Sequence, residues 1–139
     1  MAVQITFYKD RQKKIINPKL FSQTAEAMAE TIARAGQETR REGRPRLERN
    51  KRTQLRKFYD EVLRLNGDIK SKPDDWDYVL PYVNMLIAKA VYAQGRNTLV
   101  TSEFVGMLKE CINQVEQPED LDVFANFFEA FMGYYKQYE

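Results

Sequence analysis

Apolar side chains recur at spacings of three and four residues in five successive stretches of the chain. That spacing matches an α-helix with one buried face and is a poor match to the alternation of a β-strand. Breaks rich in Pro, Gly and Asn separate the stretches. A chain of 139 residues is long enough to build one hydrophobic core. We therefore expect an all-α fold, a compact bundle of about five helices with an extended N-terminal arm.

The breaks also predict where the helices begin and end. Ser, Thr, Asn and Gln suit the position before a helix, Pro suits its first turn, and Gly suits the position after it. The boundaries expected in chain order are a start at Asn17-Pro18, a start at Thr53, an end at Asn66-Gly67, an end at Gly95, a start at Thr101 or Ser102, and a start at Gln117-Pro118.

Residues 1–16 differ from the helical remainder. Val3, Ile5 and Phe7 alternate with other residues as in a short strand, but no partner strand is evident. We interpret residues 1–16 as an extended basic arm and residues 17–139 as a single helical-bundle domain. Gly43-Arg44-Pro45 interrupts any continuous helix, so a basic loop is expected near 36–50. The basic residues of the arm are Lys9, Arg11, Lys13 and Lys14.

Composition argues against most enzyme classes. The chain has no histidine and a single cysteine, Cys111, which excludes Ser-His and Cys-His catalysis and any internal disulfide. No glycine-rich phosphate loop is present. The acidic runs 74–77 and 119–122 lie at expected helix starts, where the helix dipole stabilises negatively charged carboxylates. We expect no catalytic site, no metal and no cofactor, and we interpret Cys111 as a small core residue.

Hydropathy and the N-terminal sequence argue against export. No run of about 18 apolar residues is present, and the N-terminus lacks a signal-peptide pattern. We expect a cytoplasmic protein with no membrane contact and no small-molecule substrate.

Charge is distributed very unevenly along the chain. Residues 34–57 hold ten basic side chains against three acidic ones, a net charge of +7, whereas residues 103–139 carry a net charge of −6. Arginine dominates the basic stretch, and its planar guanidinium pairs well with phosphate and stacks on bases. The competing interpretation is a solvated linker or an exposed helix face. Charge alone leaves both interpretations open, with nucleic-acid binding the favoured one.

The start of the second expected helix is the strongest candidate site. If Leu55, Phe58 and Val62 face inward, the basic residues project outward near the helix N-terminus, where free N–H groups and the dipole also attract phosphate. This pattern predicts a surface for the phosphate backbone without base recognition. Lys89 and Arg96 extend the surface if the third helix packs alongside. The candidate RNA-binding residues are Arg49, Lys51, Arg52, Arg56, Lys57, Lys89 and Arg96.

The last expected helix is unusually rich in aromatic residues. Phe124, Phe128, Phe131 and Tyr135 form one stripe, while Phe127 and Tyr134 point away from it. One interpretation is wide packing against two neighbouring helices. The other is an exposed face that binds partner proteins. The second interpretation gives the alternative function, a helical adaptor that binds partners through this helix.

Three segments resemble the small subunit of type III-A CRISPR effector complexes, the Csm complex. They are Arg52-Thr53-Gln54-Leu55-Arg56-Lys57-Phe58-Tyr59, Tyr92-Ala93-Gln94-Gly95-Arg96, and Phe124-Ala125-Asn126-Phe127-Phe128-Glu129-Ala130 followed by Tyr134, Tyr135 and Lys136. The resemblance covers about residues 50–138. A histidine is expected beside the closing tyrosine, where this chain has Tyr135.

The resemblance implies a helical bundle without nuclease activity that takes part in antiviral defence as part of a ribonucleoprotein. It implies that copies stack as a filament and contact the target RNA along the guide–target duplex. The implied partners are other Csm subunits, copies of the chain itself, guide RNA and target RNA. The basic positions that match the family segments are Arg52, Arg56, Lys57 and Arg96; Arg49, Lys51 and Lys89 come from charge and helical phase.

Overall fold

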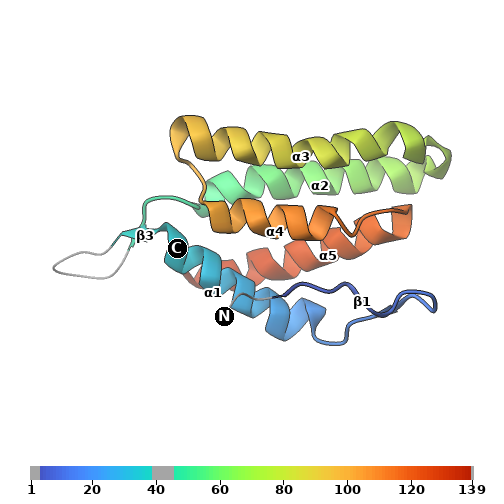
Figure 1. Ribbon diagram of the computed structural model, residues 1–139, viewed down its shortest axis with the longest axis horizontal. Helices are drawn as coiled ribbons and strands as arrows, with labels where there is room; N and C mark the ends of the chain where they lie inside the picture. The colour runs from blue at the N-terminus through green and yellow to red at the C-terminus, as the bar shows by residue number, and fades with distance from the viewer. Residues whose placement is uncertain (1–3, 39–45, 139) are drawn as a thin grey trace.

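The computed structural model describes residues 4–38 and 46–138, and within them it is built almost wholly from helices (Figure 1). This confirms the all-α bundle. The five α-helices of the described residues are α1 (Ala25–Gly36), α2 (Arg52–Ser71), α3 (Trp76–Asn97), α4 (Ser102–Ile112) and α5 (Pro118–Tyr135). A π-helical turn, η1 (Leu20–Thr24), leads into α1; the 3-10 turn η2 (Pro73–Asp75) precedes α3, and η3 (Lys136–Tyr138) follows α5.

The helix α5 is the centre of the packing. It packs against α1 on one side and α2 on the other, while α3 packs against α2 and α4 at the outer edge of the bundle (Figure 1). Phe124, Phe127, Phe128, Phe131 and Tyr135 are all fully buried. The aromatic richness of this helix therefore serves the core. The alternative prediction of an exposed aromatic face on the last helix is wrong for these five side chains, because α5 has neighbours on two sides.

The N-terminal arm is extended, but it lies against the bundle. The short strand considered for residues 3–7 does not form at residues 4–7; instead, strand β1 (Tyr8–Asp10) pairs antiparallel with β2 (Ile15–Ile16). Ile5 and Phe7 are buried. Their backbone N–H groups donate to side chains of the α4 segment, Ile5 to Glu110 Oε1 (2.7 Å) and Phe7 to Gln114 Oε1 (2.9 Å). Side chains of α4 and of the turn after it thus supply hydrogen bonds that a second strand would otherwise supply.

Two predicted helix ends are wrong. The helix α2 continues through Asn66-Gly67 to Ser71, because the buried Asn66 turns its amide to Asp122 on α5 (3.0 Å) instead of ending the helix. Pro73 follows shortly after the true end. The helix α3 passes Gly95 and ends at Asn97, where Thr98 adopts the left-handed conformation (φ 48°). The predicted starts near Ser102 and Pro118 are confirmed.

The other two starts are displaced by short distances. The helix α2 begins at Arg52, so its cap residue is Lys51 rather than Thr53. Helical backbone after Asn17-Pro18 begins at Leu20 as the π-turn η1. Asn17 holds this turn in place, because its Oδ1 accepts the Lys19 N–H (3.2 Å) and its backbone N–H donates to the Phe7 carbonyl (2.9 Å).

The segment after α1 returns to the bundle through a second small ladder. Strand β3 (Gln37–Glu38) pairs antiparallel with β4 (Arg46–Leu47), and residues 39–45, with the Gly43-Pro45 break, lie outside the described residues. The Gly36 carbonyl accepts the N–H groups of Glu48 (2.9 Å) and Arg49 (3.1 Å). A Cβ at Gly36 would lie 2.2 Å from the Arg49 carbonyl oxygen. Only glycine lets the chain before α2 approach α1 this closely.

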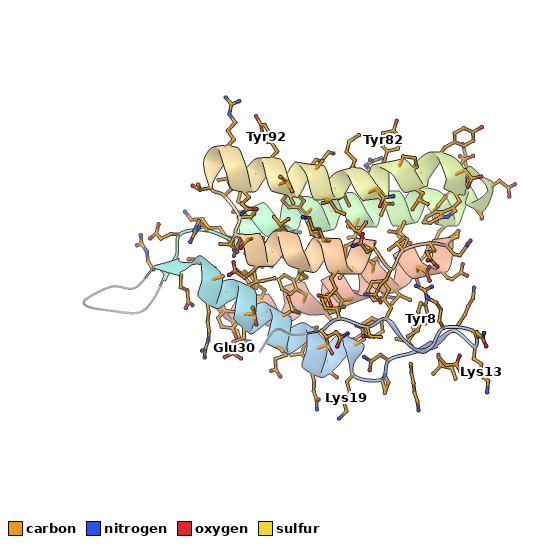
Figure 2. All side chains as sticks on the ribbon, viewed as in Figure 1. Tyr8, Lys13, Lys19, Glu30, Tyr82 and Tyr92 are labelled. Carbon is orange, nitrogen blue, oxygen red and sulfur yellow. The ribbon has the colours of Figure 1, made fainter. Side chains whose placement is uncertain are left out.

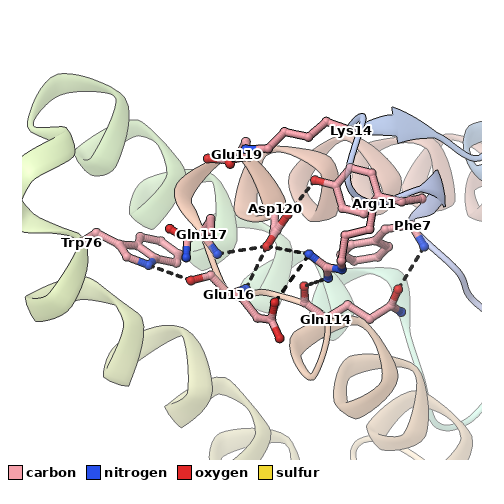
Figure 3. A network of polar contacts seen from close by, with 10 residues as sticks. Phe7, Arg11, Lys14, Trp76, Gln114, Glu116, Gln117, Glu119 and Asp120 are labelled. Atoms are coloured by element: carbon pink, nitrogen blue, oxygen red, sulfur yellow. Dashed lines mark hydrogen bonds and ion pairs between the residues drawn. The ribbon is translucent and has the colours of Figure 1, made fainter.

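The acidic run at the start of α5 has a structural role (Figure 3). Asp120 closes a capping box with Gln117 and also accepts the Tyr8 hydroxyl (2.6 Å). Burial acts to raise the pKa of Asp120. The hydrogen bonds from Tyr8 and from the N–H groups of Glu116 and Gln117, with the charge of Arg11, outweigh that effect and hold the pKa below its ordinary range.

The single cysteine lies in the core, as predicted. Cys111 is fully buried, as a small core residue should be, and burial raises the pKa of its thiol. Across residues 4–38 and 46–138, no helix combines the length and the apolar character needed to cross a membrane.

Candidate nucleic-acid interface

The first turns of α2 present the basic residues to solvent. Leu55 is fully buried, and Phe58 packs partly buried against the core, so the opposite side of the helix carries the charges. Of the predicted residues on or before α2, Arg49, Lys51, Arg56 and Lys57 are exposed and Arg52 is half-buried. The outward placement inferred from helical phase is therefore correct for Arg56 and Lys57, whereas the Nε of Arg52 is buried. The free positive end of the helix dipole adds to their charge.

A buried asparagine fixes the backbone that carries Arg49 and Lys51. Asn50 is fully buried, adopts a left-handed conformation (φ 55°), and lies directly before the cap of α2. Its amide donates to the Ile32 carbonyl (3.0 Å) and to Thr101 Oγ1 (2.8 Å), and its Oδ1 accepts the Thr101 N–H (2.9 Å). Asn tolerates this backbone conformation better than most residues.

Two more hydrogen bonds complete the Asn50 site. The Asn50 N–H donates to the Leu99 carbonyl (2.9 Å), and its carbonyl accepts the Tyr135 hydroxyl (2.6 Å). Asn50 thus joins α1, the segment between α3 and α4, and the end of α5. Sequence analysis missed this residue. Its only signal was an asparagine between two basic residues just before a helix start.

The helix α3 does lie beside α2, as the assignment of Lys89 required. The two helices run in opposite directions, and the end of α3 lies beside the start of α2 (Figure 1). A hollow of about 270 Å³ opens between them, and both Lys57 and Lys89 line it. Arg96 is exposed near the end of α3, with its guanidinium carbon 5.9 Å from the centre of the Tyr92 ring. The residues that line the hollow are Gln54, Lys57, Phe58, Glu61, Leu86, Lys89 and Ala93.

Acidic neighbours reduce the positive charge at two candidate residues. Lys89 Nζ lies 4.0 Å from Glu61 Oε1, and Arg56 Nε lies 4.0 Å from Asp60 Oδ1. The hydrogen bond from Arg64 lowers the pKa of Glu61 below its ordinary value, so this carboxylate is charged at neutral pH. The positive field is therefore strongest toward the start of α2 and weaker around Lys89. Exposed pairs of this kind are only weakly bound and exchange readily for phosphate.

The basic arm forms a separate set of contacts (Figure 3). Arg11 Nη1 lies 3.4 Å from Asp120 Oδ2 and 3.6 Å from Glu116 Oε2, and Arg11 Nη2 donates to the Gln114 carbonyl (2.8 Å). Lys14 forms an ion pair with Glu119. These two cations of the arm are occupied by the acidic end of the bundle. The arm and the start of α2 are thus distinct surfaces.

Within the part of the chain that the structure describes, no group of three or more His, Cys, Asp or Glu side chains is arranged to hold a metal ion. The site's chemistry consists of exposed guanidinium and ammonium groups on a rigid helical frame. Such groups bind anions and position them.

Comparison with known proteins gives one family. No curated protein and no solved structure matches the chain. A family model described as Csm2 Type III-A matches residues 18–139, from the turn before α1 through α5. The match takes in every candidate residue and leaves out the N-terminal hairpin. It covers nearly the whole chain and includes all three segments that carry the resemblance. The chain therefore belongs to the Csm2 Type III-A family, the small subunits of the type III-A CRISPR effector complex.

Proposed function

We propose that this chain is a non-catalytic, RNA-binding subunit of the type III-A effector complex, which stacks as a filament and contacts target RNA along the guide–target duplex. The observation that carries the proposal is the cluster of exposed basic side chains at the start of α2, on backbone that Asn50 holds rigidly. Guide RNA, target RNA and copies of the chain are its proposed partners.

The residue types favour contact with the RNA backbone. Arg49 and Arg56 offer exposed guanidinium groups that can pair with two phosphate oxygens at once, and Lys51 and Lys57 add point charges. The half-buried Arg52 adds its charge at the first position of α2. No recognition helix or aromatic RNA-binding sheet is present in the described residues. The expected binding is thus independent of base sequence, as a subunit that must accept any target requires.

Repetition compensates for weak contacts. A single chain with about four phosphate contacts binds single-stranded RNA weakly and loses affinity as roughly the −3 power of salt concentration. Copies stacked beside one guide–target duplex engage it together, so the filament raises the effective concentration of each site. Stacking of this kind needs a head-to-tail contact between different ends of the bundle.

Charge reversal on α2 tests the proposal. Complexes are assembled with the native subunit or with an Arg52→Glu, Arg56→Glu, Lys57→Glu variant, and target RNA affinity is measured across a series of salt concentrations. We expect the affinity to fall and the slope against salt to become shallower by about two to three, one for each lost phosphate contact.

A matched control has the same change in charge elsewhere. Lys9→Glu, Lys13→Glu and Lys19→Glu reverse three exposed lysines of the N-terminal arm and of the segment just before η1; Lys13 and Lys19 project from the side opposite α3 (Figure 2). This variant should retain target RNA with a nearly native slope. Equal losses in both variants would mean that net charge, and not this surface, governs binding. An unchanged α2 variant would overturn the proposal.

A further inference from the structure

The helix α3 presents a row of apolar side chains to solvent. Most of the exposed large hydrophobic residues in the described chain lie on this helix. They are Tyr78, Tyr82, Met85, Val91 and Tyr92, with exposed fractions of 76, 57, 45, 46 and 59%. Tyr82 and Tyr92 project from the outer side of the helix, away from the bundle (Figure 2). Contiguous exposed apolar surface of this kind marks a site that another molecule covers.

The spacing of these residues defines one face, which we call the α3 stripe: Tyr78, Tyr82, Met85, Lys89, Tyr92 and Arg96. Successive members are three or four residues apart, so they follow one side of the helix for about 27 Å. The opposite side of α3 carries Val83, Leu86 and Ala90, which are buried in the core. The stripe is therefore not needed for the fold of the single chain.

Charge along the stripe runs from negative to positive. Asp74 lies in the turn η2 directly before α3 and Asp77 lies in the first turn of α3, whereas Lys89 and Arg96 lie toward the end of the helix. The acidic half is a poor surface for phosphates, so RNA does not fit the whole stripe. Within the described residues, neither Asp74 nor Arg96 has an ion-pair partner. The complementary partner is a helix with the reverse order of charge.

A second copy of α3, running antiparallel, has that order. With a two-fold axis at Met85, Tyr78 of one copy faces Tyr92 of the other, and Asp74 of one copy faces Arg96 of the other. Tyr82 then lies beside Lys89 of the other copy, an arrangement suited to a cation–π contact. A two-fold contact forms every pair twice, so complementary charges are doubled.

We infer that two copies of this chain pair through their α3 stripes in an antiparallel, two-fold contact. One helix pair buries less surface than a standard interface, so the pairing is weak and reversible. It closes on itself, and thus differs from the head-to-tail stacking proposed for the filament. Pairing also covers Lys89 and Arg96, which are candidate RNA-binding residues. Paired chains should therefore bind RNA less well, an expectation that rests on the proposed function.

Sedimentation of the purified chain over a range of concentrations tests the inference. The native chain should pass from monomer to dimer as concentration rises. Asp74→Lys or Arg96→Glu alone should each weaken the dimer by about tenfold, because each change turns two attractive pairs into repulsive ones. Tyr92→Ser, at an exposed position, should weaken it without affecting the fold. Lys19→Glu and Glu26→Lys on exposed positions elsewhere are the controls.

Mixing the two charge variants gives the most specific result. The Asp74→Lys chain keeps its native Arg96, and the Arg96→Glu chain keeps its native Asp74. These two chains should pair with each other, because both contacts across the axis are then attractive. The mixture should therefore recover dimers that neither variant forms alone, and the double variant Asp74→Lys, Arg96→Glu should recover them too. A head-to-tail contact has only one such pair per junction and would also recover in the mixture, but it would continue to larger oligomers as concentration rises instead of stopping at the dimer.

Three results would overturn the inference: a native chain that stays monomeric at high concentration, a dimer that tolerates the single reversals, or a mixture that does not recover. If the free chain stays monomeric and the α3 stripe instead binds another Csm subunit in the assembled complex, the inference is overturned as well. A different result would overturn the proposed RNA function alone. In that result, the α2 charge reversal leaves target RNA binding unchanged, while the Asp74 and Arg96 variants still change the dimer as predicted.

Discussion

Asn50 shows how a single buried side chain can shape an exposed surface. It makes hydrogen bonds to three other segments of the chain, and it lies between two of the candidate RNA-binding residues. Sequence analysis identified the cations because charge is visible in composition. It could not identify Asn50, because the partners of Asn50 lie 18, 51 and 85 residues away along the chain.

Replacing Asn50 tests its role. Asn50→Gly keeps the left-handed backbone accessible and removes only the side-chain hydrogen bonds, so we expect a loss of about 2–4 kcal/mol in the free energy of unfolding. Tyr135→Phe removes one hydrogen bond to the same residue and should cost about 1–2 kcal/mol. Urea unfolding of both variants checks these values. Losses within roughly 0.5 kcal/mol of zero, the scatter of surface changes, would contradict the role given to Asn50.

Asp120 predicts a dependence of stability on pH. Its pKa is lower in the folded chain than the ordinary value of 3.8, so the stability that it contributes is present above that value and is lost as pH falls through the folded pKa. The free energy of unfolding should therefore decline on acidification below about pH 5. Asp120→Asn should lower stability at neutral pH and flatten the decline. An equally steep decline in the variant would show that other carboxylates cause it.

At the scale of elements, the spacing of apolar residues predicted the buried faces of the helices reliably, whereas residue types at the breaks predicted the helix ends poorly. The buried stripes of α2, α4 and α5 follow from spacing, since residues three or four apart share a face. Gly67 and Gly95 were predicted to end helices because glycine usually does so, but tertiary contacts and Pro73 decide the end of α2. Val91 is 46% exposed, because none of the described elements packs against the outer side of α3.

The two glycines of α1 and α2 predict opposite effects of the same substitution. A Cβ at Gly67 meets nothing within 4 Å, so Gly67→Ala should stabilise the chain by about 0.5–1 kcal/mol through helix propensity. A Cβ at Gly36 meets the Arg49 carbonyl oxygen at 2.2 Å, so Gly36→Ala should lower the free energy of unfolding by about 1–3 kcal/mol. Thermal unfolding of both variants checks the signs. The same sign for both would contradict the packing described between α1 and the segment before α2.

At the scale of the whole molecule, the uneven charge of the sequence divides into distinct surfaces. The acidic start of α5 is partly neutralised by Arg11 and Lys14 of the arm, while the cations at the start of α2 face solvent. Sequence analysis found both charge clusters but could not pair the arm with α5, because that contact joins residues more than 100 positions apart. It also could not place Lys89, whose assignment depends on α3 lying beside α2.

The central claim is that the start of α2 lies against target RNA in the assembled complex. Site-specific photo-crosslinking tests it most directly, with a benzophenone amino acid at Lys57 or, as the control, at Lys19 on the opposite side of the bundle. Both positions are exposed, so neither substitution should disturb the fold. We predict crosslinks to target RNA from position 57 and few or none from position 19. RNA crosslinks from position 19 alone, or equally from both, would contradict the claim.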